Sequence, residues 1–227
     1  MSIEIKKCAV LGAGVMGAQI AGHIANAGIP SLLFDMNEEL AQKGVDGLSK
    51  LKPAPLFSSS NASLVTPCTY DNDMEKLNDC DLIIEAVAEK IEIKHAVYKN
   101  LLPHLKQGAI LASNTSGIPL ANLVEVLPED VQKSFLIAHF FNPPRYLKLL
   151  ELVKGEKTSD EVYETMTEFG ETTLGKGIVH AKDTPGFIGN RLINAGGPLT
   201  YHKACLLYTS DAADDSLRVD LGGRRII

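Results

Sequence analysis

Two ionisable residues interrupt neighbouring apolar runs of the sequence. The first run, residues 135–138, ends on His139, and the second, residues 147–153, carries Glu151 in its middle. An imidazole with a pKa of about 6.5 can take a proton from an alcohol at neutral pH. A carboxylate on its other ring nitrogen orients the imidazole and stabilises the imidazolium. The pair is typical of a general base, although a histidine at a strand end is more often a polar boundary residue.

A glycine-rich segment near the start of the chain indicates a second chemistry. The letters GAGVMG place Gly12, Gly14 and Gly17 in a G-x-G-x-x-G pattern between a predicted strand and a predicted helix. In this pattern the first glycine permits a tight turn, the second lets the backbone approach a pyrophosphate, and the third allows close helix–strand packing. Val15 and Met16 open the helix, whose N-terminus offers free N–H groups and the positive end of its dipole to phosphates. The alternative is a purely structural glycine turn.

Asp35 narrows the choice of nucleotide. It ends the second predicted strand, 18 positions after Gly17, and is followed by Met36 and Asn37 rather than an arginine. A carboxylate at this place accepts hydrogen bonds from the adenosine ribose and repels a 2′-phosphate. The sequence therefore predicts NAD rather than NADP as the cofactor.

Two further polar segments could contribute to the same site. The letters SNTSG follow a predicted strand and place Asn114 and Ser116 at the carboxyl edge of the sheet, where α/β folds bind ligands. The letters DTPGFIGNR lead through a Pro-Gly turn into a helix that carries Asn190. Taken alone, the first segment is compatible with an ordinary polar loop and the second with an ordinary helix start.

The elements that must position these residues alternate along the chain. Strands are predicted over residues 7–11, 31–35, 82–86, 109–113, 134–138, 149–154 and 177–181. Helices are predicted over residues 15–27, 38–50, 91–105 and 158–174 and from Pro185 onward, with an irregular loop over residues 52–64. The turn before strand 149–154 is too short for a helical crossover, so that strand should be antiparallel. We expect an α/β fold with a doubly wound, mostly parallel sheet.

Composition excludes several classes of protein. The net charge of −6 and the scattered basic residues give no reason to expect nucleic acid or an anionic membrane as a partner. No apolar run approaches the ~20 residues of a membrane span, and the first residues lack the apolar core of a signal peptide. The four cysteines form no C-x-x-C pair and are interpreted as buried thiols rather than metal ligands. A cytoplasmic location is predicted.

Taken together, the motifs GAGVMG, SNTS, HFFNP and DTPGFIGNR, with Glu151, resemble the L-3-hydroxyacyl-CoA dehydrogenases of fatty-acid β-oxidation from about residue 6 to 204. The resemblance implies a Rossmann-type domain followed by the first helix of a truncated all-α domain. It also implies NAD-dependent oxidation of an (S)-3-hydroxyacyl-CoA to the 3-oxoacyl-CoA. The intact protein would be a homodimer or a multidomain β-oxidation enzyme, and the loop LKPAPLF is more similar to the large bacterial multidomain proteins.

The resemblance also implies roles for individual residues. His139 would be the general base and Glu151 its partner. Substrate oxygens would be held by Ser116 and Asn190, the site supported by Asn142, and NAD bound by Gly12, Gly14, Val15, Met16, Gly17, Asp35, Glu89, Lys94 and Asn114. Without the resemblance, Glu89 and Lys94 would be interpreted as a solvated helix start. The positions that contact CoA in the family do not align with this chain, so no CoA residues are assigned.

Three parts are predicted along the chain. Residues 1–184 would form the NAD-binding domain and residues 185–204 the start of the helical domain. The composition changes at residue 205, and residues 205–227 resemble a translated sequencing adapter, so they are predicted to be a non-native tail rather than a genuine C-terminal segment. We expect the 227-residue chain to bind NAD but to turn over little substrate.

Two other functions are compatible with the motifs. A related dehydrogenase could use the same base on a free 3-hydroxy acid or a sugar acid. A non-catalytic module could sense the NADH/NAD ratio, but such a module has no use for a general base. The set Ser116, His139, Glu151 and Asn190 therefore argues against a pure sensor.

Overall fold

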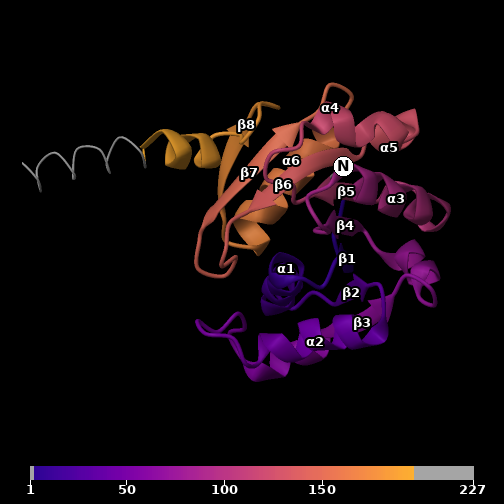
Figure 1. Ribbon diagram of the computed structural model, residues 1–227, viewed down its shortest axis with the longest axis vertical. Helices are drawn as coiled ribbons and strands as arrows, with labels where there is room; N and C mark the ends of the chain where they lie inside the picture. The colour runs from indigo at the N-terminus through magenta and orange to yellow at the C-terminus, as the bar shows by residue number, and fades with distance from the viewer. Residues whose placement is uncertain (1–2, 197–227) are drawn as a thin grey trace, which may run out of the picture. The chain divides into compact units, whose positions relative to one another are not determined.

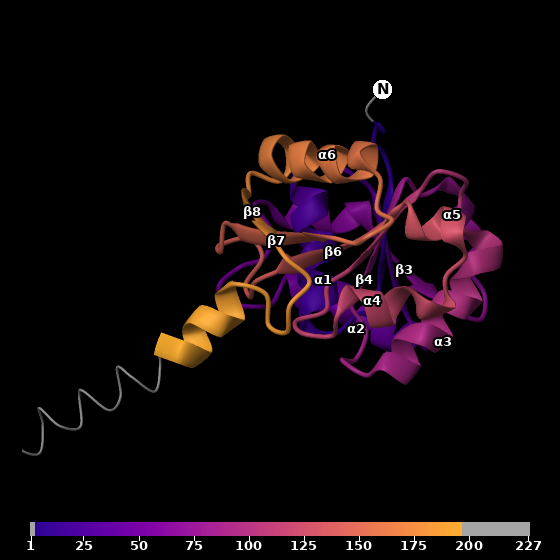
Figure 2. The same cartoon turned by 90° about the horizontal axis from the view of Figure 1, so that it is seen from above.

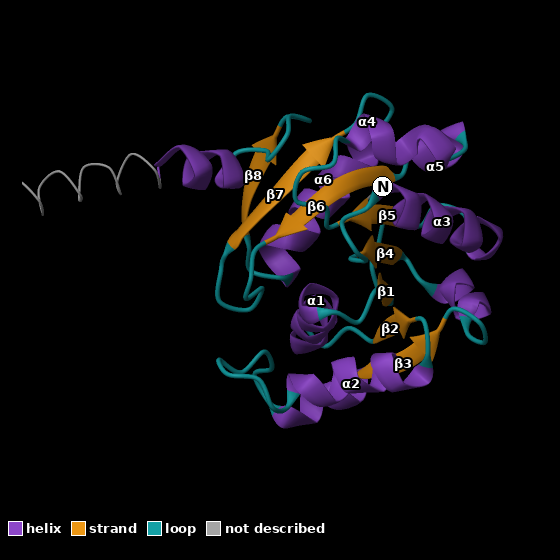
Figure 3. Ribbon diagram, viewed as in Figure 1, coloured by secondary structure: helices purple, strands orange, loops and turns teal. Residues whose placement is uncertain are grey.

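A computed structural model describes residues 3–196 and contains a single eight-stranded sheet in the order β3-β2-β1-β4-β5-β6-β7-β8 within them (Figures 1 and 3). The strands are β1 (Cys8–Leu11), β2 (Ser31–Asp35), β3 (Val65–Thr69), β4 (Leu82–Glu85), β5 (Ile110–Ser113), β6 (Phe135–Phe140), β7 (Leu149–Lys154) and β8 (Gly177–Ala181). The helices are α1 (Val15–Asn26), α2 (Glu38–Leu48), α3 (Ile91–Leu101), α4 (Leu120–Leu123), α5 (Glu129–Gln132) and α6 (Asp160–Glu168). Short 3-10 or π-helical segments cover Ser59–Leu64, Met74–Asp79, Leu102–His104, Val124–Val126 and Phe169–Thr173.

The sheet is buried because helices cover both of its faces (Figure 2). Helices α1 and α6 contribute to one apolar cluster, which includes Ile20, Ile24 and Met166. Helices α3 and α4 contribute to the other, which includes Tyr98 and Leu123. Strands β1, β4 and β5 lie between the two clusters and are fully buried, as their continuous apolar runs predict. The expected doubly wound fold is confirmed.

Strand direction places the predicted site at one edge of the sheet. Every neighbouring pair is parallel except β6–β7, which is antiparallel, as predicted from the short connection. The chain passes from β1 to β2 and β3 on one side and to β4, β5 and β6 on the other, so the order reverses between β1 and β4. Ligands of open α/β sheets bind outside the carboxyl ends of the strands at such a point.

Some expectations from the sequence were wrong. Strand β3 (Val65–Thr69) was not predicted, because Pro67 weakens a strand pattern; β3 is an edge strand, where a proline is tolerated. The predicted loop over residues 52–64 ends in the helical turn Ser59–Leu64. The short helices α4 and α5, with four residues each, were also missed.

The helix after β8 begins later than predicted. Pro185 lies in a turn, and the helix covers residues 189–196. Gly186 and Phe187 have φ angles of +77° and +46°, which lie outside the right-handed helical region and delay the helix. The described residues divide into two units at this point, the first ending at Phe187 and the second beginning at Ile188. Residues 197–204 of the predicted part 185–204 and all of the predicted part 205–227 lie outside the described residues, and the predicted domain boundary stays a prediction.

His23 is a buried histidine on α1 that the sequence did not single out. Its Nε2 lies 3.1 Å from the carbonyl oxygen of Leu174, whereas Nδ1 is buried without a hydrogen-bond partner. Burial, with the positive charges of Lys176 and Arg145 nearby, lowers the pKa of His23 to about 4. Protonation would place a charged N–H group in the core without an acceptor, so folding favours the neutral ring.

We therefore expect His23 to make the fold acid-sensitive. A folded-state pKa below the unfolded value means that the unfolded chain binds more protons, so stability falls as the pH drops from about 6.5 to 4. The contribution of this residue is at most about 3 kcal/mol. Urea unfolding at pH 7.5 and 4.5 should show a smaller loss of stability in His23→Gln than in the wild type. Equal losses would show that His23 is not the acid-sensitive group.

Candidate active site

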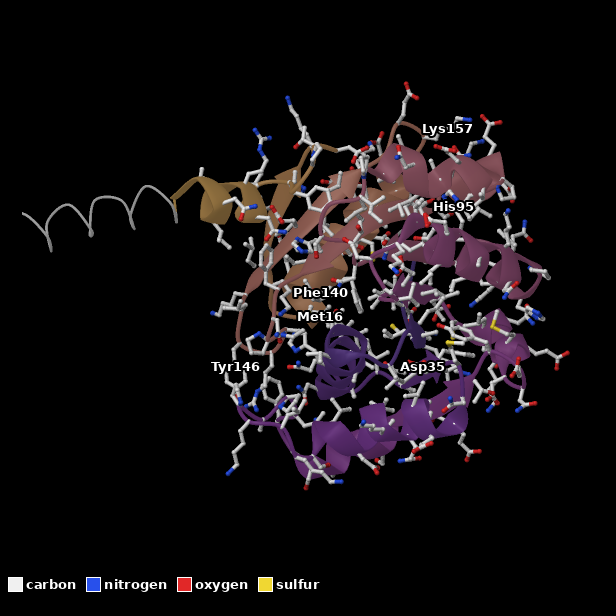
Figure 4. The ribbon with its side chains drawn as sticks, in the orientation of Figure 1. Met16, Asp35, His95, Phe140, Tyr146 and Lys157 are labelled. Carbon is white, nitrogen blue, oxygen red and sulfur yellow. The ribbon has the colours of Figure 1, made fainter. Side chains whose placement is uncertain are left out.

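The carboxyl ends of β5 and β6 are tied together by Asn114. Its Oδ1 accepts a hydrogen bond from the backbone N–H of Phe140, at 2.9 Å. Figure 4 labels Phe140 at the end of β6 and Asp35 at the end of β2. The sequence grouped Asn114 with the nucleotide-binding residues, a role that stays a prediction. In the structure it holds the loop after β5 beside the strand that carries His139.

His139 and Glu151 meet as the sequence predicted. They are directly opposite in the antiparallel pair β6–β7, and His139 Nδ1 lies 2.8 Å from Glu151 Oε2. Glu151 is fully buried and His139 is 4% exposed. The rings of Phe141 and Phe187 lie 4.5 and 5.6 Å from the imidazole, measured between centroids. A carboxylate accepts hydrogen bonds, so Nδ1 is the ring nitrogen that donates to Glu151.

The glycine-rich loop has the geometry that a nucleotide pyrophosphate needs. Gly12 has a φ of +105°, and a Cβ atom added to Gly17 would lie 1.8 Å from the carbonyl oxygen of Gly12. Around Gly14, by contrast, a Cβ atom would meet nothing within 4 Å. Gly14 is also the N-cap of α1, and no side chain caps that helix end. Val15, at the first position of α1, is 67% exposed. Gly12 and Gly17 are thus required by the fold, whereas Gly14 leaves room for a ligand at uncapped N–H groups.

Asp35 lies beside this loop at the end of β2. Its Oδ2 accepts a hydrogen bond of 2.7 Å from the N–H of Ala13, and its Oδ1 accepts one of 2.7 Å from the N–H of Met36. The carboxylate is therefore held next to the glycine loop. This place fits the ribose contact predicted for it.

The residues Glu89 and Ser116 are brought together by the structure. Glu89 Oε1 accepts hydrogen bonds from the N–H of Ser116, at 2.6 Å, and from the hydroxyl of Thr115, at 2.8 Å. Lys94 Nζ lies 3.2 Å from Glu89 Oε2, and the side chain of Lys94 is only 1% exposed. Although burial raises the pKa of Glu89, the Ser116 N–H and the charge of Lys94 lower it below its ordinary value. Lys94 is thus an internal side chain rather than part of a solvated helix start.

Asn142 lies in the first unit of the structure, whereas Asn190 lies in the second. Asn142 Oδ1 accepts a hydrogen bond of 3.2 Å from Gln19 of α1, which links the loop after β6 to the helix that begins at the glycine loop. This contact agrees with a supporting role. Asn190 lies in the second unit, on the helix over residues 189–196, and its role stays a prediction.

Sequence reasoning missed residues that complete the site. Glu85 interrupts the apolar run of β4 just as Glu151 interrupts that of β7, so the same signal could have found it. Phe187 packs on the imidazole of His139 from a segment 48 positions later, which no local pattern indicates. Among the described residues, no group of three or more His, Cys, Asp or Glu side chains is placed to hold a metal ion.

These features define a class of protein. A Rossmann-type sheet with an open glycine loop, a carboxylate beside that loop and a buried His–Glu pair at the carboxyl edge of the sheet is the arrangement of a nicotinamide-dependent dehydrogenase domain. Of the helices in residues 3–196, none is both long and apolar enough to cross a membrane.

Comparison with known proteins identifies the family. The family model described as "3-hydroxyacyl-CoA dehydrogenase, NAD binding domain" matches residues 7–184, and the chain belongs to this family. NAD is therefore the cofactor of this domain. The chain is 45% identical, over 84% of its length, to a probable 3-hydroxyacyl-CoA dehydrogenase of Deinococcus radiodurans. It is 44% identical, over 85% of its length, to a putative fatty acid oxidation complex trifunctional enzyme of Rickettsia felis.

The fold of this chain is also similar to a solved structure, and the chain spans only part of the length of its relatives. The crystal structure of 3-hydroxybutyryl-CoA dehydrogenase from Escherichia coli matches 84% of this chain with a TM-score of 0.74 and 31% identity, and 41% of that protein is covered. The chain spans 57% of the Deinococcus protein and 28% of the Rickettsia protein. The resemblance predicted from the motifs is confirmed at the level of the family.

The place of Asp35 leads to a prediction about nucleotide choice. Because its carboxylate lies beside the glycine loop, a 2′-phosphate would meet a negative charge. NAD(H) should bind at least about tenfold more tightly than NADP(H), a difference of about 1.4 kcal/mol. Calorimetric titration of both nucleotides measures this ratio, and Asp35→Asn should narrow it. Comparable affinities in the wild type would remove Asp35 from the ribose site.

The glycine loop allows a matched pair of substitutions. The backbone of Gly14 (φ −67°, ψ −175°) suits alanine, so Gly14→Ala should keep the melting temperature but weaken NAD binding by about tenfold or more. Gly17→Ala should lower the melting temperature, because its Cβ would collide with Gly12. Thermal melts and NAD titrations separate the two effects. Full NAD affinity in Gly14→Ala would show that the pyrophosphate does not approach Gly14.

Proposed function

We propose that the intact protein oxidises an (S)-3-hydroxyacyl-CoA to the 3-oxoacyl-CoA with NAD, as β-oxidation requires. The observation that carries the proposal is the buried pair of His139 and Glu151, joined at 2.8 Å at the carboxyl edge of the sheet. The acyl-CoA part of the substrate is supported by the names of the relatives. Alcohol oxidation by a nicotinamide dehydrogenase is supported by the residues themselves.

His139 takes the proton of the substrate hydroxyl on Nε2, because its Nδ1–H is already donated to Glu151. The imidazolium that forms is stabilised by the buried carboxylate of Glu151. Bound NAD would supply the acceptor for the hydride that leaves the carbon bearing this hydroxyl. The flanking rings of Phe141 and Phe187 keep water from the imidazole and limit its rotation.

Ser116, in the loop after β5, is the next residue to which we assign a role with the substrate. Ser116 follows β5, and its backbone is fixed by the 2.6 Å hydrogen bond to Glu89. We assign its side chain and that of Asn190 to the substrate's oxygens, as in the resembled family. A homodimer, or a larger multidomain enzyme like the trifunctional relatives, is part of the same proposal. The cytoplasmic location also stays a prediction.

A choice of substrates tests the proposal against its alternatives. With NADH, the intact protein should reduce acetoacetyl-CoA at least about 10²-fold more efficiently than free acetoacetate, judged by kcat/KM. NADH absorbance follows the reaction. A preference for the free acid would indicate a dehydrogenase of 3-hydroxy acids. Tight nucleotide binding without turnover of either substrate would indicate a sensing module.

The His–Glu pair itself is tested by a double-mutant cycle in the intact protein. His139→Gln should lower kcat by roughly 10²–10⁴ with little change in NAD affinity, since the general base acts in the chemical step. Glu151→Gln should also lower kcat because it acts through His139. The double variant should then be hardly worse than His139→Gln alone. Losses that simply multiply would show that the two residues act separately.

A further inference from the structure

Glu85 is a fully buried carboxylate to which none of the roles above is assigned. It ends β4, one strand from the glycine loop of β1. It accepts hydrogen bonds from four donors: Val87 N–H at 2.8 Å, Lys94 Nζ at 2.7 Å, Tyr98 hydroxyl at 2.9 Å and Ser113 hydroxyl at 2.6 Å. A buried carboxylate is stable only with such partners, and one of the four is a full positive charge.

Lys94 connects Glu85 to the active site. Its ammonium lies 2.7 Å from Glu85 and 3.2 Å from Glu89. Glu89 in turn holds the backbone N–H of Ser116. We call Glu85, Lys94 and Glu89 the acid–lysine–acid triad. Its formal charge is −1, because two carboxylates share one ammonium.

The triad lies beside the place where the nicotinamide must bind. Its exposed end, Glu89, contacts the loop of Thr115 and Ser116. That loop is tied through Asn114 to Phe140, the residue next to His139. A substrate whose hydroxyl is held by His139 must have its reacting carbon within reach of the nicotinamide. The ring is therefore close to both His139 and the triad.

We propose that Glu85 sets the preference of this site between oxidised and reduced nucleotide. The nicotinamide ring of NAD⁺ carries one positive charge and that of NADH carries none. A net negative charge in poorly solvated surroundings therefore favours NAD⁺ over NADH. At a separation of about 10 Å and an effective dielectric constant of about 20, one unit of charge changes the relative affinity by about tenfold or more. The inference rests on the proposed role of His139 only for the place of the ring.

The substitution Glu85→Gln tests this charge. Glutamine keeps the volume of the side chain but makes the triad neutral. Titration of NAD⁺ and of NADH by calorimetry, with the 227-residue chain, gives the ratio Kd(NAD⁺)/Kd(NADH). We expect this ratio to rise about tenfold in Glu85→Gln. Structural damage alone would weaken both nucleotides alike and leave the ratio unchanged.

Asp81, at the opposite end of β4 from Glu85, offers a matched control. Asp81 directly precedes β4 and accepts hydrogen bonds from the backbone of Lys6 and Lys7 and from Lys106 Nζ. Asp81→Asn removes the same unit of charge but at the amino edge of the sheet, away from the nucleotide. Its ratio of affinities should equal that of the wild type.

The outcomes decide the proposal. An unchanged ratio in Glu85→Gln, or an equal change in Asp81→Asn, would overturn it. If Glu85→Gln does not fold, Glu89→Gln removes the same charge from the exposed end of the triad and must raise the ratio too; no rise there would overturn the proposal as well. The titrations need no acyl-CoA, so a shifted ratio without acyl-CoA oxidation would support this inference while contradicting the proposed function.

Discussion

The site depends on the register of a single antiparallel strand pair. Side chains alternate between the two faces of a sheet, so a slip of one residue between β6 and β7 would move Glu151 away from His139. Both side chains are buried, and an unpaired carboxylate there would be strongly unfavourable. The pairing that joins His139 to Glu151 is therefore also a condition for stable packing. It fixes β7 in the reverse direction and places β8, parallel to β7, at the edge of the sheet.

Buried and half-buried charges lie at the ends of other strands along the same edge of the sheet. Asp35, at the end of β2, is held by the N–H of Ala13, and the acid–lysine–acid triad begins at Glu85, the end of β4. No side chain caps the start of α1, and we propose that its N–H groups bind the pyrophosphate. In the proposed binding mode, the negative charge of the triad favours the positively charged nicotinamide, and the positive end of the α1 dipole favours the phosphates.

Local patterns in the sequence predicted the fold and much of the site. Continuous apolar runs marked the central strands, and a carboxylate or imidazole within such a run marked Glu151 and His139. The edge strand β3 escaped because Pro67 opposes the strand pattern, and only its pairing with β2 stabilises it. The late start of the helix over residues 189–196 depends on the positive φ angles of Gly186 and Phe187, which composition does not show. The family resemblance assigned Lys94 to the nicotinamide. Its burial between two carboxylates could not be predicted, because it depends on the packing of α3 against β4 and β5.

The protonation state of His139 Nε2 tests most directly whether His139 can act as the general base. If Glu151 orients His139 as a base, Nδ1 carries the proton at neutral pH and Nε2 does not. Nitrogen-15 NMR of histidine-labelled protein, assigned by comparison with His139→Gln, distinguishes the two tautomers. We expect a protonated Nδ1 and an unprotonated Nε2 in His139 at pH 7.5. A proton on Nε2 at that pH would contradict it, because the ring would then have no lone pair to offer the substrate.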